Sequence, residues 1–114
     1  MSVNAEREQD AVAFQLLGFV GDYENHVCAR VEEWPLAARL REIDPILGEM
    51  QVLGGILPHL APAWARFHVS HVELLEKLMH AERADSQRLD WLEAHMAAIL
   101  QLEAKCLDVL AHKA

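Results

Sequence analysis

Hydrophobic residues recur every three or four positions over most of this chain, which is the period of an amphipathic α-helix. The first such stripe predicts a helix from about Asn4 to Trp34. Its apolar positions are Val12, Leu16, Phe19, Val20, Tyr23, Val27, Val31 and Trp34. Each glycine inside a helix costs about 1 kcal/mol relative to alanine, so a break near Gly21 is one option. The stripe keeps its phase across that point, which favours a continuous helix.

Two prolines divide the next part of the chain. Pro35 ends or kinks the first helix, because proline has no N–H and restricts the residue before it to extended conformations. A second helix is predicted from about Pro35 to Leu57. Asp44-Pro45 resembles an N-cap followed by proline in the first turn, which predicts a kink or a short restart there. The stripe of this helix is Leu36, Leu40, Ile43, Leu47, Met50 and Leu57, flanked by Ile46 and Leu53.

Two further helices complete the predicted fold. Gly54-Gly55 ends the second helix, and the proline-containing segment 58–62 forms a turn. The third helix is predicted from about Pro62 to Ala84, and the fourth from a cap at Asp85 or Ser86 to about His112. No strand pattern is present. We therefore predict an all-α protein, one domain over residues 1–114, folded as an antiparallel four-helix bundle with kinks near Pro35 and Pro45.

The last two helices carry polar residues on their apolar faces. His71 lies in the middle of the third stripe, formed by Trp64, Phe67, Leu74, Leu75, Leu78 and Met79, and His68 lies one turn earlier and slightly off centre. Glu103 lies within the fourth stripe, formed by Leu89, Leu92, Met96, Ile99, Cys106, Leu107 and Leu110. A buried carboxylate needs a partner because of its desolvation penalty. In antiparallel helices, residues at equal distances along the chain from the connecting turn lie opposite each other. A turn near residue 85 therefore places His68 and His71 near Glu103.

Two hypotheses explain this polar cluster. In the first, His68, His71 and Glu103 bind a divalent metal as a His2Glu set with an open fourth position, and Tyr23 is a conceivable extra ligand or outer donor. In the second, the cluster is a structural polar layer in which Glu103 accepts from one imidazole and raises its pKa. A variant of the second places the stripe of helix three or four at a subunit interface.

The other aromatic and histidine residues give weaker signals. His95 falls mostly off the predicted core face. Trp91 also falls away from the main stripe, so an exposed Trp91 beside His95 and Leu102 would mark a contact surface.

Composition excludes several classes of function. The chain has 114 residues, with 10 Lys+Arg against 18 Asp+Glu and a formal net charge of −8. Its scattered cations argue against nucleic-acid binding.

No apolar stretch reaches the roughly 18 residues of a membrane span, and the start lacks signal-peptide features, so a cytoplasmic location is expected. Cys28 and Cys106 form no C-x-x-C pair and are expected to be ordinary small residues. No nucleophile or phosphate-loop motif is present, so we expect no enzyme activity.

The hydrophobic share of 53% is more than a small bundle easily hides. It predicts a non-enzymatic protein that acts through protein–protein interaction, as an adaptor, chaperone or regulator, and that forms a homodimer. The alternative is a metal- or cofactor-binding bundle that uses His68, His71 and Glu103. The sequence identifies neither a particular cofactor nor a particular partner.

Overall fold

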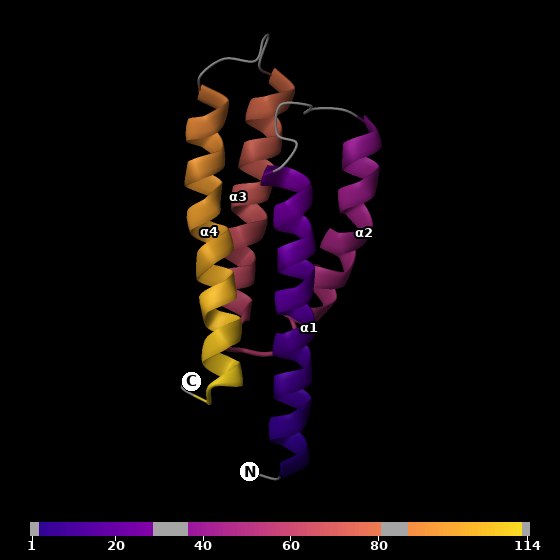
Figure 1. Cartoon of the computed structure of the whole chain (residues 1–114), viewed down its shortest axis with the longest axis vertical. Coiled ribbons are helices and arrows are strands. Elements are labelled where there is room, and N and C mark those ends of the chain that lie inside the picture. Colours follow the sequence, from indigo (N-terminus) through magenta and orange to yellow (C-terminus); the bar gives the residue numbers. More distant parts are fainter. Residues whose placement is uncertain (1–2, 29–36, 81–86, 113–114) are drawn as a thin grey trace.

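The computed structural model describes residues 3–28, 37–80 and 87–112, and over these residues the chain forms helices and turns. The helices are α1 (Val3–Cys28), α2 (Ala37–Gly54), α3 (Ala61–His80) and α4 (Gln87–Leu110). They lie side by side along the long axis of a molecule that measures 54 × 23 × 19 Å, and the start of α1 projects beyond the end of α4 (Figure 1). The prediction of an all-helical bundle is confirmed.

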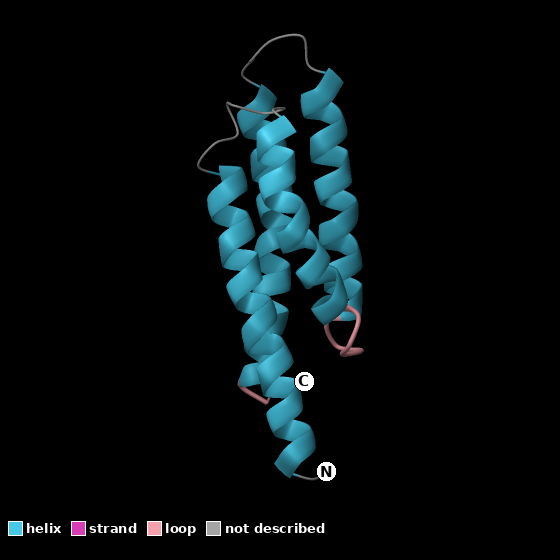
Figure 2. Ribbon diagram, turned by 90° about the vertical axis from the view of Figure 1, so that its right-hand side faces the viewer, coloured by secondary structure: helices cyan, strands magenta, loops and turns pink. Residues whose placement is uncertain are grey.

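The core lies where α1 and α4 face α2 and α3. Helix α1 packs against both α2 and α4, and α3 packs mainly against α4, whereas α2 and α3 touch only slightly. A view turned by 90° shows the helices running along the length of the molecule (Figure 2). The buried apolar residues come from all of these helices and from the α2–α3 turn. They are Ala13, Leu16, Val20, Tyr23, Val27, Ile43, Met50, Leu53, Leu57, Leu60, Ala63, Phe67, Leu74, Ile99, Leu102, Cys106 and Val109.

Helix α1 is continuous through Gly18 and Gly21, so the break considered near Gly21 does not form. Its predicted stripe is buried at Leu16, Val20, Tyr23 and Val27. The described part of α1 ends at Cys28, and the predicted kink at Pro35 lies outside the described residues.

Helix α2 contains Pro45 in its interior. The helix starts at Ala37, upstream of the Asp44-Pro45 pair, so this pair does not begin a separate helix. Proline leaves the carbonyl one turn earlier without its N–H partner. The kink at Pro45 stays a prediction.

Helices α2 and α3 meet closely at Gly54. A Cβ added there would lie 2.6 Å from Cγ of Trp64. The missing side chain of Gly54 therefore lets the Trp64 indole pack against the end of α2. After Ile56, backbone hydrogen bonds from Leu60 and Ala61 to the Leu57 carbonyl lead into α3. The predicted turn is thus confirmed.

The buried face of α4 is rotated by about one residue from the predicted stripe. His95, Ala98, Ile99, Leu102, Cys106 and Val109 are buried, while Leu107 is 53% exposed. Trp91 is partly buried and packs against the core, so the prediction of an exposed Trp91 is wrong. The physical reason is that apolar residues cover more than one face of α4. Two neighbouring rows of residues therefore both show the three- and four-residue spacing of a buried helix face.

Candidate functional site

A chain of hydrogen bonds crosses the core and joins α1, α3 and α4. The Tyr23 hydroxyl lies 2.7 Å from Nδ1 of His71 and 2.6 Å from Nε2 of His95. The other ring nitrogen of His95, Nδ1, lies 2.6 Å from Oγ of Ser70. We call Tyr23, His71, His95 and Ser70 the buried polar layer. Phe67 packs edge-on against the Tyr23 ring and closes the layer on its apolar side.

The protons of this layer can be assigned in two ways. Tyr23 has one hydroxyl proton, so it donates to one imidazole and accepts an N–H from the other. When Tyr23 donates to His71, His95 carries its proton on Nε2 and accepts from the Ser70 hydroxyl at Nδ1. When Tyr23 donates to His95, His95 carries its proton on Nδ1 and donates to Ser70. Both arrangements satisfy every bond in the chain with neutral imidazoles.

Burial keeps both imidazoles neutral. Desolvation lowers the pKa of His71 to about 4, with a further lowering from the nearby His68 and a small opposing effect of Asp44. Desolvation also lowers the pKa of His95 to about 4, and the neighbouring His71 adds to this effect. A charged imidazole would lose its hydration in the core without gaining a carboxylate. A rise of the His71 pKa through Glu103, as the polar-layer hypothesis would require if His71 is its partner, is therefore wrong.

The structure separates the three residues predicted to bind a metal. His71 lies in the buried polar layer, as its position on the apolar stripe predicted. His68 is exposed, and its ring lies beside the Trp64 indole. Glu103 is half-buried and lies near Glu24 of α1, whose carboxyl contributes to raising the pKa of Glu103. In the part of the chain that the structure describes, no three His, Cys, Asp or Glu side chains form a group that could hold a metal ion. Metal binding by His68, His71 and Glu103 stays a prediction that this geometry does not favour.

The expected meeting of Glu103 with the histidines depended on the register of α3 and α4. Arg66 donates a 2.8 Å hydrogen bond to Gln101, and Ser70 pairs with His95. His68, which lies between Arg66 and Ser70 on α3, is therefore opposite the part of α4 between His95 and Gln101, and it does not reach the position of Glu103. The described part of α3 ends at His80, and the predicted end near Ala84 lies outside the described residues.

Glu103 instead lies between α4 and α1. Partial burial raises its pKa, and the neighbouring Glu24 carboxyl raises it further. Burial, with a smaller contribution from Glu103, also raises the pKa of the Cys106 thiol to about 11.

Sequence reasoning missed two members of the buried polar layer, Ser70 and His95. His95 was assigned to solvent because the α4 stripe was placed one residue out of phase. Ser70 is half-buried and reaches across to His95 on the neighbouring helix. A usable signal was present: Trp91, His95, Ala98, Leu102, Cys106 and Val109 also follow a spacing of three and four.

Large apolar side chains are exposed on the side where α1 meets α4. Phe14 is 70% exposed, Leu100 54% and Leu107 53%. Two contacts place them along one seam: Glu24 with Glu103, and His112 Nε2 3.5 Å from Oδ2 of Asp10. Residues three or four apart share a helix face, so Phe14 follows Asp10, and Leu100 and Leu107 lie on either side of Glu103. We call the exposed surface around these three residues the α1–α4 flank.

The flank carries a regular pattern on α4. Its exposed positions Ala97, Leu100, Ala104, Leu107 and Ala111 follow each other at intervals of three and four, all without charge. Such a narrow stripe is typical of a seam between two helices. On α1, Ala11, Phe14, Gly18 and Gly21 repeat the same spacing, and a side chain added at either glycine would meet open space.

None of the described helices is sufficiently long and apolar to pass through a bilayer. Comparisons with protein families, with curated proteins and with solved structures found no match to this chain.

Proposed function

We propose that this protein is a non-enzymatic helical bundle that acts through protein–protein contact, as an adaptor, chaperone or regulator, and that it pairs with a second copy of itself. The observation that carries the proposal is the α1–α4 flank, with its uncharged stripe on α4. Apolar surface removed from water contributes roughly 25 cal/mol per Å² to association. Large apolar side chains gathered on one face are therefore a feature of contact surfaces.

A second copy suits this surface because the flank contains both protruding and recessed positions. Phe14, Leu100 and Leu107 protrude, while Gly18, Gly21 and Ala104 leave space between them. In a two-fold dimer each copy presents the same patch, so the protruding residues of one copy face the recesses of the other. The uncharged stripe on α4 agrees with this, since a chain of net charge −8 repels a second copy least where its surface carries no charge.

The test compares lysine substitutions at equally exposed positions. Sedimentation equilibrium is expected to give a dimer for the unchanged chain and a dimer at least tenfold weaker for Leu107→Lys, because the lysine charge would be buried at the interface. The matched control is Val69→Lys on α3, where Val69 is 56% exposed, and it is expected to dimerise normally. A monomer at about 1 mM contradicts the proposal. Loss of the dimer in Val69→Lys alone would assign the interface to another face.

The arrangement of the helices belongs to the same proposal. We propose that neighbouring helices run antiparallel and that α2 is kinked at Pro45. Two side-chain pairs support the antiparallel order of α3 and α4, since Arg66 pairs with Gln101 while the later Ser70 pairs with the earlier His95. The missing N–H of Pro45 supports the kink. A cytoplasmic location is proposed because the Cys106 thiol is unbridged, as is usual in a reducing compartment.

A further inference from the structure

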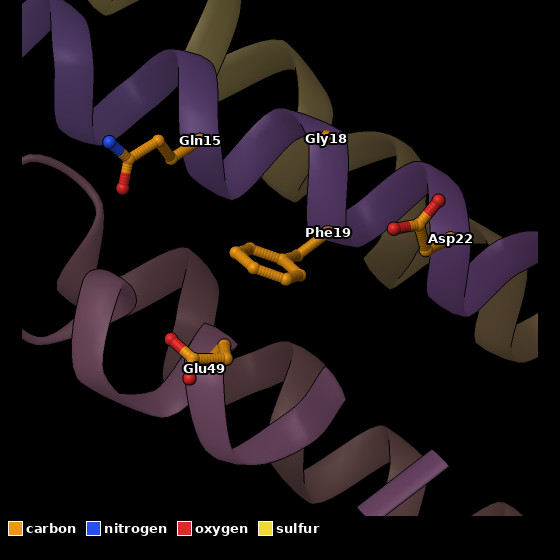
Figure 3. A pocket seen from close by; sticks show the side chains of 5 residues that line it. All are labelled: Gln15, Gly18, Phe19, Asp22 and Glu49. Atoms are coloured by element: carbon orange, nitrogen blue, oxygen red, sulfur yellow. The ribbon is translucent and has the colours of Figure 1, made fainter. Parts of the chain in front are cut away.

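A pocket opens between α1 and α2, beside the α1–α4 flank, with which it shares Gly18. It has a volume of about 440 Å³ and is lined by Gln15, Gly18, Phe19, Asp22 and Glu49. Figure 3 shows the Phe19 ring projecting from α1 towards the helix that carries Glu49, with Gln15 and Asp22 on either side of the ring. Four of the five lining residues lie on one face of α1, because 15, 18, 19 and 22 are three or four positions apart.

The pocket combines an empty position at Gly18 with an aromatic ring and two carboxylates. Gly18 has no side chain, and a Cβ added there would meet nothing within 4 Å. The partly buried Phe19 ring supplies an apolar wall in the resulting hollow. The carboxylates of Asp22 and Glu49 bring negative charge from two different helices to the same hollow. No ion pair or hydrogen bond engages either carboxylate among the residues that the structure describes.

We infer that this pocket binds the ammonium end of an alkylamine. Two carboxylates attract a cation, the amide oxygen of Gln15 accepts an N–H, and an aromatic wall packs against methylenes and attracts a nearby positive charge. An anion or a neutral polar ligand would leave both carboxylates uncompensated. The net charge of −8 raises the local concentration of cations around the molecule. This inference does not rest on self-association, since the Phe19 ring and both carboxylates lie where α1 faces α2.

The ammonium of a butylamine chain is the chemistry shared by a free amine and a lysine side chain. The probe for the site is therefore n-butylammonium, titrated into isotope-labelled protein and followed by backbone amide chemical shifts. Saturable shifts are expected around residues 15–22 and near Glu49, with a Kd on the order of 1 mM for a ligand of this size. Neutral 1-butanol is expected to bind at least tenfold more weakly. Equal binding of both probes, or no saturable shift up to about 20 mM butylammonium, would overturn the inference.

Substitutions then assign the charge to this pocket. The double variant Asp22→Asn with Glu49→Gln is expected to weaken butylammonium binding by about tenfold, since each exposed charge contributes a factor of about two to five. Glu73→Gln removes an exposed carboxylate from α3 and serves as the matched control, with binding unchanged. An equal loss in the control would mean that butylammonium responds only to net charge, which also overturns the inference.

Two further probes distinguish the sources of the cation. N-acetyl-lysine N-methylamide presents the ammonium as a polypeptide does, whereas 1,4-diaminobutane presents two ammonium groups, one for each carboxylate. Tighter binding of the diamine identifies a free diamine as the ligand class. Equal or tighter binding of the lysine derivative identifies a lysine of a protein. Failure of the dimer test leaves both results unaffected, because all of these titrations detect the pocket directly.

Discussion

At the scale of single residues, the Tyr23 hydroxyl has the largest structural role. It bonds to two imidazoles on different helices and thereby links α1, α3 and α4 inside the core. Buried polar groups are costly only when they lack a partner. The layer therefore stabilises one particular register of three helices, because a shift by one residue would leave His71 or His95 unsatisfied.

Replacement of Tyr23 by phenylalanine is expected to lower the free energy of unfolding by about 1–3 kcal/mol, because two buried nitrogen atoms lose their partner. Urea denaturation at pH 7 measures the change. Ser70→Ala is the comparison variant and is expected to cost less, since Ser70 is only half-buried and water can replace its hydroxyl. Equal costs for the two variants would contradict a central role of Tyr23.

Acid is expected to destabilise the fold through His71 and His95. Both have a folded pKa of about 4, against 6.5 in the unfolded chain. Between these values the unfolded state binds more protons, so the free energy of unfolding falls as the pH is lowered from about 6.5 to 4. Each histidine contributes at most roughly 3 kcal/mol to this loss. Glu103 acts in the opposite direction, because a raised carboxyl pKa favours the folded state on acidification, but its partial exposure weakens the effect.

Urea denaturation at several pH values between 7 and 4 measures this slope. His95→Gln is expected to reduce it, whereas His59→Gln, at an exposed position in the α2–α3 turn, is expected to leave it unchanged. A slope that is the same in all three proteins would show that other groups control the acid sensitivity.

At the scale of elements, the hydrophobic pattern predicted helices reliably and their orientation less so. The stripes of α1 and α3 fit their buried faces because polar residues border them on both sides. Helix α4 has few polar residues to mark its outer face, so its phase was misassigned by one position. The structure resolves the ambiguity through His95, which reaches Tyr23 and Ser70 only when α4 is rotated in this way.

Two glycines within α2 are expected to respond oppositely to alanine. Gly54→Ala is expected to lower the free energy of unfolding by about 1–3 kcal/mol, because its Cβ would overlap Trp64. Gly48 faces open space, so Gly48→Ala is expected to raise stability by about 0.5–1 kcal/mol through helix propensity. Urea denaturation of both variants checks the pair, and a stabilised Gly54→Ala protein would show that Trp64 moves aside freely.

At the scale of the whole molecule, an elongated bundle with little room to bury every apolar side chain exposes several of them. Its long sides differ in the charge of their exposed residues. On α4 the stripe of the α1–α4 flank is uncharged, whereas the groove between α1 and α2 carries Asp22 and Glu49. The proposed dimer contact and the proposed cation pocket therefore lie next to each other and share Gly18.

Self-association predicts that thermal stability depends on protein concentration. A hundredfold rise in concentration adds about 2.7 kcal/mol to a dimer through mass action, which corresponds to an increase in Tm of several degrees. Differential scanning calorimetry of the unchanged chain is expected to show this increase, and the Leu107→Lys variant is expected to show none. A concentration-independent Tm for the unchanged chain would argue against the dimer.

The amino-acid sequence by itself determined the helical fold, the approximate helix ends that lie within the described residues, and the burial of Tyr23 and His71, because these follow from local periodicity and from proline and glycine positions. The tertiary structure decided which polar residues meet. The meeting of Glu103 with Glu24, and of His95 with Tyr23, depends on the rotation and register of packed helices. A shift of one residue rotates a helix by about 100°, so small errors in helix ends and stripe phase give different side-chain partners while the helices themselves remain correctly predicted.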